Sequence, residues 1–199
     1  MIREADATAS MHTVRILGIS GSARKGSYNT ALLVEAQGLL PEGASLRICD
    51  ISDLPLFSQD AEKSPPEQVV RFKREVEEAD ALLFAATEHN LTVTALLKNA
   101  IEWGDRPPGQ NSWNGKPAAI VSASTSMRGG ARAQLNLRQI MVDINVYPIN
   151  RPQLMIGNAE TAFGPDLRLV DGKTRETLKQ VVQALVDWTR RVGGGAPSG

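Results

Sequence analysis

Short apolar runs alternate with amphipathic segments along most of the chain. Runs rich in aliphatic and β-branched residues occupy positions 14–19, 46–49, 81–86 and 118–121, and they predict buried strands. Apolar residues at helical spacing occupy the segments 30–40, 66–78, 91–103 and 130–142. Because parallel strands need crossover connections and helices supply them, this order predicts an α/β fold with a parallel sheet covered by helices on both faces.

The pattern becomes less regular after residue 142. We expect a short strand near Val146, a proline-rich stretch, a hairpin through residues 167–173 and a last helix from Thr174 to about Val192. The 199 residues fit one domain, expected over 13–192, with a disordered lead at 1–12 and a disordered tail at 193–199. The segment 104–116, rich in Gly, Pro and Asn, is either a lid or interface element or a solvated connection.

The composition argues against several classes of partner and site. The 22 basic and 22 acidic residues cancel, so no basic surface for nucleic acid or an anionic membrane is expected. The single cysteine, Cys49, cannot form an internal disulfide, and one cysteine with two histidines argues against a zinc site. No apolar run approaches the roughly 20 residues that span a bilayer, and the first ten residues lack the apolar stretch of a signal peptide. We therefore expect a cytoplasmic protein.

A loop rich in Gly and Ser follows the first apolar run and leads directly into a helix. Open α/β sheets bind ligands at the carboxyl ends of their strands, and a helix N-terminus offers unpaired N–H groups to an anion. The loop adds short polar side chains, two glycines and an arginine that can pair with phosphate. These residues are Ser20, Gly21, Ser22, Arg24, Gly26, Ser27 and Asn29. The segment is therefore typical of a phosphate site, and the alternative is an ordinary turn capped by Ser27 or Asn29.

The spacing of this loop argues against two common phosphate ligands. Gly21 and Gly26 have the separation of a Walker loop, but Ser27 stands where lysine is required. The G-x-G-x-x-G pattern of dinucleotide-binding folds does not occur in the segment. A mononucleotide such as FMN remains.

Two further polar turns follow predicted strands. Thr87, Glu88, His89 and Asn90 come after the run 81–86, and the segment 122–130 comes after the run 118–121. Three strand ends would thus converge on one crevice. Ser124 and Ser126 have no His and Asp at a recognisable spacing, so a serine hydrolase is not expected.

Two motifs together resemble those of the NADPH-dependent FMN reductases, including the bacterial quinone and chromate reductases. The family pattern G-S-x-R-x-x-S-x-N is matched in full at positions 21–29, and P-E-Y-N followed by L-K-N-A-I-[DE]-W corresponds to 87–90 and 97–103. GGAR at 129–132, LRQI at 137–140 and NRP at 150–152 are also similar to this family. The resemblance covers about residues 13–192.

The resemblance implies a flavodoxin-like three-layer sandwich with a five-stranded parallel sheet and bound FMN. It implies that Ser22, Arg24, Ser27 and Asn29, with Tyr28 beside them, hold the FMN phosphate. The residues expected to border the flavin ring are Thr87, Glu88, His89, Asn90, Ser124, Thr125, Ser126 and Gly129. No side chain need act as a nucleophile, because the flavin would pass electrons from NADPH or NADH to a quinone, a free flavin or chromate in a ping-pong reaction.

Members of this family are commonly homodimers or homotetramers. The helix that carries Arg132, Leu135, Arg138 and Ile140 resembles their interface helix, and Glu88 could join Arg132 in that contact. Arg106 and Arg128 are candidates for reading the 2′-phosphate of NADPH, and the alternative for each is an ordinary solvated arginine.

Three positions depart from the family pattern. Thr87 and Thr94 stand where proline is usual, and His89 stands where tyrosine is usual. Loss of proline loosens the turn, and an imidazole changes the surface beside the flavin. The alternatives are a flavin-binding or regulatory protein without reductase activity, and an electron-carrier flavodoxin, which the neutral charge disfavours.

Overall fold

The computed structural model describes residues 12–193, which form a parallel sheet between two layers of helices. The sheet has the order β2-β1-β3-β6-β7, and β8 also pairs with β6. Its strands are β1 (Val14–Ser20), β2 (Ala44–Cys49), β3 (Ala81–Ala85), β6 (Pro117–Ala123), β7 (Tyr147–Pro148) and β8 (Leu154–Ile156). Residues 1–11 of the predicted lead and 194–199 of the predicted tail lie outside the described residues.

The predicted α/β class and parallel sheet are confirmed, but the expected fifth strand is split. β7 pairs in parallel with the start of β6, and β8 pairs in parallel with its end. Between the two pieces the chain passes Asn150 and Pro152, and proline cannot donate to a sheet ladder. The edge position is therefore shared by two short strands.

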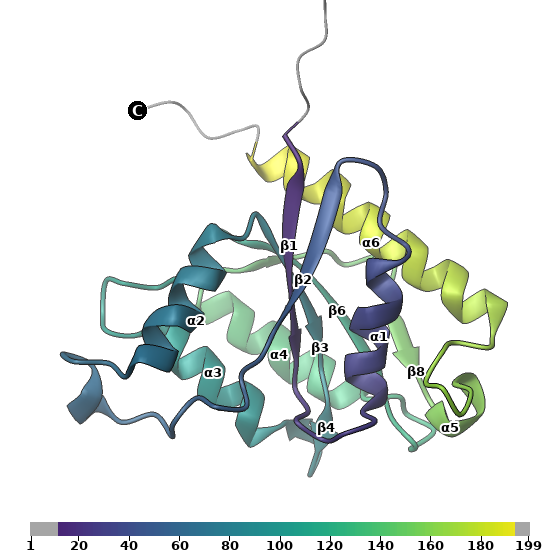
Figure 1. Cartoon of the computed structure of the whole chain (residues 1–199), viewed down its shortest axis with the longest axis horizontal. Coiled ribbons are helices and arrows are strands. Elements are labelled where there is room, and N and C mark those ends of the chain that lie inside the picture. The colour runs from purple at the N-terminus through teal and green to yellow at the C-terminus, as the bar shows by residue number, and fades with distance from the viewer. Residues whose placement is uncertain (1–11, 194–199) are drawn as a thin grey trace, which may run out of the picture.

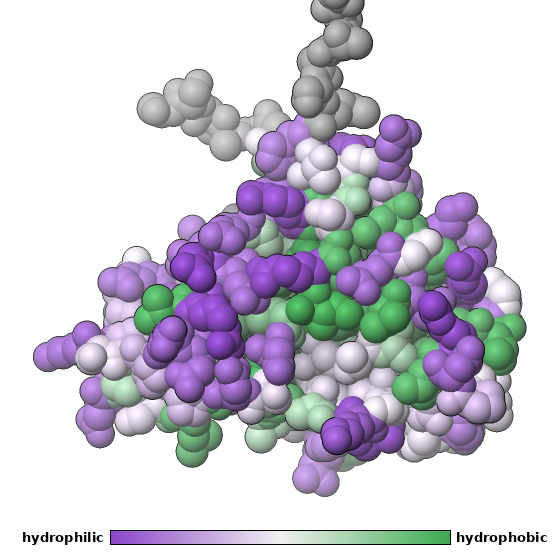
Figure 2. All heavy atoms as spheres, in the orientation of Figure 1, coloured by the Kyte–Doolittle hydropathy of each residue, from purple (hydrophilic) through white to green (hydrophobic). Residues whose placement is uncertain are grey.

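Each face of the sheet is covered by its own helices (Figure 1). One layer holds α1 (Tyr28–Gln37), α5 (Ala159–Ala162) and α6 (Gly172–Gly193), and the other holds α2 (Glu67–Glu78), α3 (Ala95–Asp105) and α4 (Ala131–Asp143); a short 3-10 turn, η1 (Gln59–Ala61), precedes α2. Figure 2 shows polar side chains over α2 and an apolar strip between β2 and α1. Among residues 12–193, no helix combines the length and apolar composition needed to cross a bilayer.

The central strands are buried on both faces, as their unbroken apolar runs predict. Leu82 and Phe84 of β3 point into the core under α2, α3 and α4, whereas Leu83 and Ala85 point into the core under α1 and α6. Alternate side chains of one strand thus fill two separate cores.

The helix predicted over 91–103 begins later, because a small hairpin precedes it. β4 (Glu88–His89) pairs antiparallel with β5 (Thr92–Val93). The two residues between them, Asn90 and Leu91, have φ values of 48° and 70°, as a two-residue type I′ hairpin turn requires. Thr94 then caps α3, since its hydroxyl accepts from the N–H of Leu97.

Two other predicted elements need correction. The hairpin over 167–173 is wrong: the structure has a single isolated bridge between Phe163 and Leu169, and α6 already begins at Gly172. The helix predicted over 30–40 runs from Tyr28 to Gln37, because the Ser27 hydroxyl caps its start by accepting from the N–H of Thr30.

The segment 104–116 is anchored against α2 and α3. The Trp113 side chain is fully buried, and its Nε1 donates to the carbonyl of Ile101 at 3.1 Å. Lys73 donates to the carbonyls of Arg106 and Gln110. None of this segment lines the cleft described below. The segment is therefore anchored to the protein at several points and does not border the cleft, so the lid interpretation is not supported.

Candidate functional site

Loops that follow β1, β3 and β6 enclose a cleft of about 750 Å³ at the carboxyl edge of the sheet. This size is typical of a small-molecule or cofactor site. Ten residues predicted for the site line it: Ser22, Arg24, Ser27, Tyr28, Asn29, Thr87, Glu88, His89, Ser124 and Thr125. The cleft therefore lies where the strand order predicts a ligand site.

The β1–α1 loop, residues 21–27, forms the wall of the cleft at the start of α1. Ser27 occupies the cap position, so the backbone N–H groups of Tyr28 and Asn29 in the first turn have no acceptor within the helix. Gly26 has a φ of 70°, which turns the chain into the helix. The Arg24 guanidinium is exposed and lies 5.8 Å from the centroid of the Tyr28 ring. Unpaired N–H groups beside a cation suit an anion.

The Asn29 side chain forms hydrogen bonds within the protein. Its amide donates to the carbonyl of Ala123 at 2.9 Å and accepts from the N–H of Ala123 at 3.0 Å, with Asn29 only 4% exposed. This pair ties α1 to the end of β6. These two bonds use one amide hydrogen and the side-chain oxygen of Asn29, and the backbone N–H of Asn29 remains without an acceptor in the helix.

Glu88 stabilises the start of α4. One of its carboxylate oxygens accepts from the backbone N–H groups of Arg132 and Ala133, at 3.0 and 3.2 Å. The cap residue of α4, Gly130, has no side chain to do this, so Glu88 replaces it from the hairpin. The other oxygen lies 3.8 Å from the Arg132 guanidinium. Glu88 and Arg132 thus pair within one chain.

The wall after β3 approaches the β1–α1 loop closely. A Cβ on Gly21 would lie 3.1 Å from the backbone nitrogen of Thr87. Thr94, which the sequence marks only as a departure from proline, donates its hydroxyl to the Gly21 carbonyl at 2.7 Å. Thr87 Oγ1 is buried and has no hydrogen-bond partner among the described residues. His89 is exposed and borders both the cleft and an adjoining hollow of about 440 Å³.

Three predicted residues do not line the cleft: Asn90, Ser126 and Gly129. Asn90 forms the hairpin turn and borders the adjoining hollow. Ser126 accepts from the N–H of Arg128 within its own loop. Gly129 has a φ of 60°, and a Cβ there would lie 2.8 Å from the carbonyl carbon of Met155. Ser126 and Gly129 thus shape the third loop.

Sequence reasoning missed several cleft residues. Ala23, Ala95, Leu96 and Ala123 line the cleft without any polar group that could mark them. Thr94 could have been found, because a threonine directly before an apolar-periodic segment is a helix-cap signal. Of the two arginines considered for the 2′-phosphate, Arg106 pairs with Glu62 at 2.6 Å away from the cleft, whereas Arg128 is exposed in the third loop.

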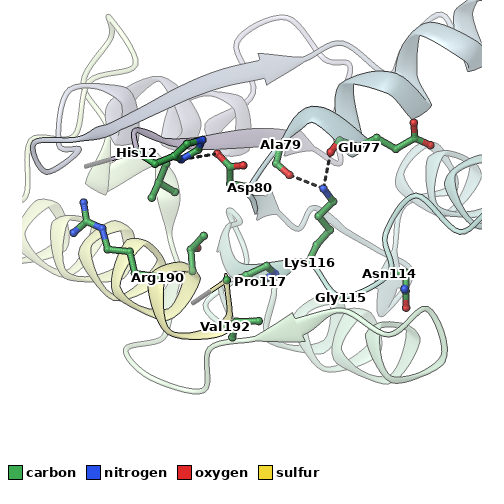
Figure 3. Close-up of a pocket in the computed structure, with 13 residues that line it drawn as sticks. His12, Glu77, Ala79, Asp80, Asn114, Gly115, Lys116, Pro117, Arg190 and Val192 are labelled. Carbon is green, nitrogen blue, oxygen red and sulfur yellow. Dashed lines mark hydrogen bonds and ion pairs between the residues drawn. The ribbon is translucent and has the colours of Figure 1, made fainter. Parts of the chain in front are cut away.

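A second hollow, of about 660 Å³, opens at the amino edge of the sheet (Figure 3). Its two partly buried charges already have partners. Lys116 Nζ donates to the carbonyls of Glu77 and Ala79 at 2.8 and 2.6 Å, which closes the end of α2, and burial lowers its pKa. Asp80 accepts three hydrogen bonds from Arg15. These charges serve the fold, so the carboxyl-edge cleft is the candidate site.

Comparison with known proteins finds relatives that are NAD(P)H-dependent reductases. The chain is 50% identical over 183 residues to an NAD(P)H-dependent FMN reductase of Pseudomonas aeruginosa, covering 91% of this chain and 98% of that one. It is 41% identical over 194 residues to the NADPH:quinone oxidoreductase of Arabidopsis thaliana, covering 94% and 97%. The solved structure of the flavoenzyme NAD(P)H:(acceptor) oxidoreductase FerB from Paracoccus denitrificans is 34% identical, with a TM-score of 0.83 and coverage of 89% and 98%.

The sequence model of one family, described as NADPH-dependent FMN reductase, matches residues 14–161. This span contains β1, β3, β6 and the three loops around the cleft. The chain therefore belongs to the NADPH-dependent FMN reductase family.

Proposed function

We propose that this protein is an FMN-dependent NAD(P)H oxidoreductase whose acceptors are quinones and free flavin, with chromate as a further candidate. The observation that carries the proposal is the cleft at the carboxyl edge, where the unpaired N–H groups of α1 and Arg24 lie in one wall. The names of the relatives, an FMN reductase and quinone oxidoreductases, support the same chemistry.

The residues of the cleft fit FMN. We assign its phosphate to Ser22, Arg24 and Ser27 with the N–H groups of Tyr28 and Asn29, because this wall gathers donors and a cation. The ring would lie between the Thr87–His89 wall and the turn at Ser124 and Thr125. The buried Thr87 hydroxyl, which has no protein partner in the described chain, favours a polar ligand edge near this wall.

When bound, FMN supplies electron transfer from NAD(P)H to the acceptor. The protein's own groups would bind and orient it: the β1–α1 loop holds one end, and the small residues Gly21 and Ala123 allow backbone to approach it. His89 lies exposed at the border with the adjoining hollow, where it would contact the nicotinamide or the acceptor. We expect the two substrates to take turns at one face, which is a ping-pong reaction. Arg128 remains the candidate for a 2′-phosphate.

We also propose that the protein is a homodimer or homotetramer through α4. Leu135 is 64% exposed on this helix, and Leu91 of the neighbouring hairpin is 60% exposed. Arg138 is held within the chain, since it donates to the carbonyl of Ile149 at 2.9 Å. Leu135→Asp should therefore lower the oligomeric state on calibrated gel filtration, and a wild-type monomer would contradict the proposal.

The free Cys49 and the need for NAD(P)H favour a cytoplasmic location for this protein.

The test of function is to purify the protein, record its visible spectrum with and without added FMN, and follow NADPH oxidation with a quinone present. We expect a flavin spectrum that NADPH bleaches and the quinone restores. A protein that binds FMN without oxidising NADPH or NADH would instead be a flavin-binding or regulatory protein. A protein that does not bind added FMN would contradict the assignment of the cleft.

A further inference from the structure

A segment outside the cleft packs against two of the loops that form it. We call residues 157–171 the buttress segment. The N–H of Ala159 donates to the carbonyl of Ser124 at 3.0 Å, and a Cβ on Gly157 would lie 2.4 Å from the carbonyl oxygen of Met127. The buttress segment therefore lies directly against the loop after β6.

The same segment contacts the start of α1 through an aromatic stack. The rings of Tyr28 and Phe163 lie 5.1 Å apart at an interplanar angle of 31°, and Phe163 is only 5% exposed. The Arg24 guanidinium lies over the Tyr28 ring on the cleft side, 5.8 Å from its centroid. Phe163 thus fixes the ring over which Arg24 rests. Leu167 adds a contact near Gly26, 3.9 Å from the position of a Cβ there.

An ion pair fastens the buttress segment to the C-terminal turn of α1. Glu35 is 4% exposed, and its carboxylate accepts from the Arg168 guanidinium at 2.9 Å. Arg175 of α6 lies 3.7 Å from the other carboxylate oxygen. A buried carboxylate is costly unless it is paired, so this contact holds the segment in one place. The Arg168 carbonyl accepts from the N–H of Gly164, which closes the segment on itself.

We propose that the buttress segment positions the β1–α1 loop for phosphate, with Phe163, Glu35 and Arg168 as positioning residues. This inference rests on the proposed FMN function and extends it to residues that do not line the cleft. A loop held in its binding conformation loses less conformational entropy when the ligand binds. The family model matches the chain only as far as residue 161, so the contacts of the buttress segment made by Phe163, Leu167 and Arg168 lie beyond the matched span.

The test compares FMN with riboflavin, which has the same ring and no phosphate. Phe163→Leu and Glu35→Gln should each raise the Kd for FMN about 3- to 10-fold, as expected for loss of one aromatic or charged contact. The Kd for riboflavin should change less than about 2-fold on the same scale. Flavin fluorescence quenching measures both constants. In the apoprotein, amide hydrogen exchange over residues 22–28 should become faster in both variants.

The matched control is Glu75→Gln. Glu75 also pairs with an arginine at 2.9 Å, but its partner Arg47 lies on β2 and neither residue lines the cleft. This variant should leave the ratio of the two constants unchanged. Arg168→Lys, which keeps the charge, should retain more FMN affinity than Arg168→Gln.

The outcomes separate the two proposals. A wild-type protein that binds FMN, together with folded variants whose ratio of FMN to riboflavin affinity is unchanged, would overturn the role of the buttress segment alone. An equal shift of that ratio in Glu75→Gln would overturn it as well. A wild-type protein with no affinity for either flavin would overturn the proposed function, and the buttress inference with it.

Discussion

The two edges of the sheet carry hollows of similar size, about 750 Å³ at the carboxyl edge and about 660 Å³ at the amino edge, yet their buried polar groups differ. At the carboxyl edge, the first turn of α1 has N–H groups without helical acceptors, and Thr87 Oγ1 is buried without a partner in the described residues. At the amino edge, the partly buried charges Lys116 and Asp80 are paired within the fold. Unmatched hydrogen-bonding groups therefore indicate a binding site better than volume does.

The difference follows from the direction of the strands. In a parallel sheet with crossover helices, the helices begin at the carboxyl edge and end at the amino edge. Helix starts offer N–H groups and a partial positive charge, which suit an anionic ligand. Helix ends offer carbonyls, and here Lys116 takes those of Glu77 and Ala79. The N–H groups at the carboxyl edge are thus available to a ligand, whereas the carbonyls at the end of α2 are bound by Lys116 of the same chain.

The largest expected effect comes from a pair of glycine substitutions, one at each edge. Gly129 and Gly115 both have positive φ, 60° and 74°, but a Cβ at Gly129 would meet backbone at 2.8 Å, whereas Gly115 has nothing within 4 Å. We expect Gly129→Ala to lower the free energy of unfolding by about 2–5 kcal/mol, from backbone strain and overpacking together. Gly115→Ala should lower it by only about 1–2 kcal/mol. Urea unfolding measures both, and equal losses would show that the close approach contributes nothing.

Arg24→Ala should weaken FMN binding by about 1–3 kcal/mol, the usual scale of a charge-assisted hydrogen bond. The control is Arg190→Ala, because Arg190 is a cation that lines the hollow at the amino edge. It should leave the FMN Kd unchanged. Fluorescence titration with FMN measures the Kd of both variants. If the two variants bind FMN with equal affinity, Arg24 does not contribute to the phosphate site.

Replacing each of two threonines in the same wall of the cleft by valine should change the stability of the apoprotein in opposite directions. Thr87→Val removes a buried hydroxyl that lacks a protein partner, so the apoprotein should gain about 1 kcal/mol of stability. Thr94→Val removes a hydroxyl that donates to Gly21 and caps α3, so the apoprotein should lose about 1–2 kcal/mol. Urea unfolding without FMN is the measurement. Destabilisation by Thr87→Val would mean that its hydroxyl is satisfied in solution.

The smallest effect is expected at Asp80, at the amino edge. Burial alone would raise the pKa of Asp80, but the hydrogen bonds from Arg15 outweigh burial and lower it. Because the folded-state pKa lies below the unfolded value of about 3.9, the stabilisation is complete above that value and is lost as pH falls through the folded pKa. Asp80→Asn should cost less than about 1 kcal/mol at pH near 7, since the pair is partly exposed. The difference from wild type should shrink in acid, and a constant difference would exclude the ion pair as its cause.

Local patterns were enough to predict the central strands of the sheet and the loops around the cleft. The central strands are uniformly apolar because both of their faces are buried, and this pattern can be recognised from consecutive residues. The β1–α1 loop was also predicted, since its glycines, Ser27 and the following helix are adjacent in the chain. The small β4–β5 hairpin was missed, because two residues in each strand leave no periodic pattern to detect.

The sequence by itself determined the α/β fold, the family and the three loops that meet at the carboxyl edge. Only the tertiary structure decided what the side chains in those loops do. Asn29 bonds to a residue 94 positions away, Glu88 caps a helix 44 positions away, and Arg168 pairs with Glu35 across 133 positions. Periodicity and cap signals are set by neighbours within one or two turns, whereas a long-range polar partner is chosen when the folded chain brings a donor and an acceptor to the same buried place.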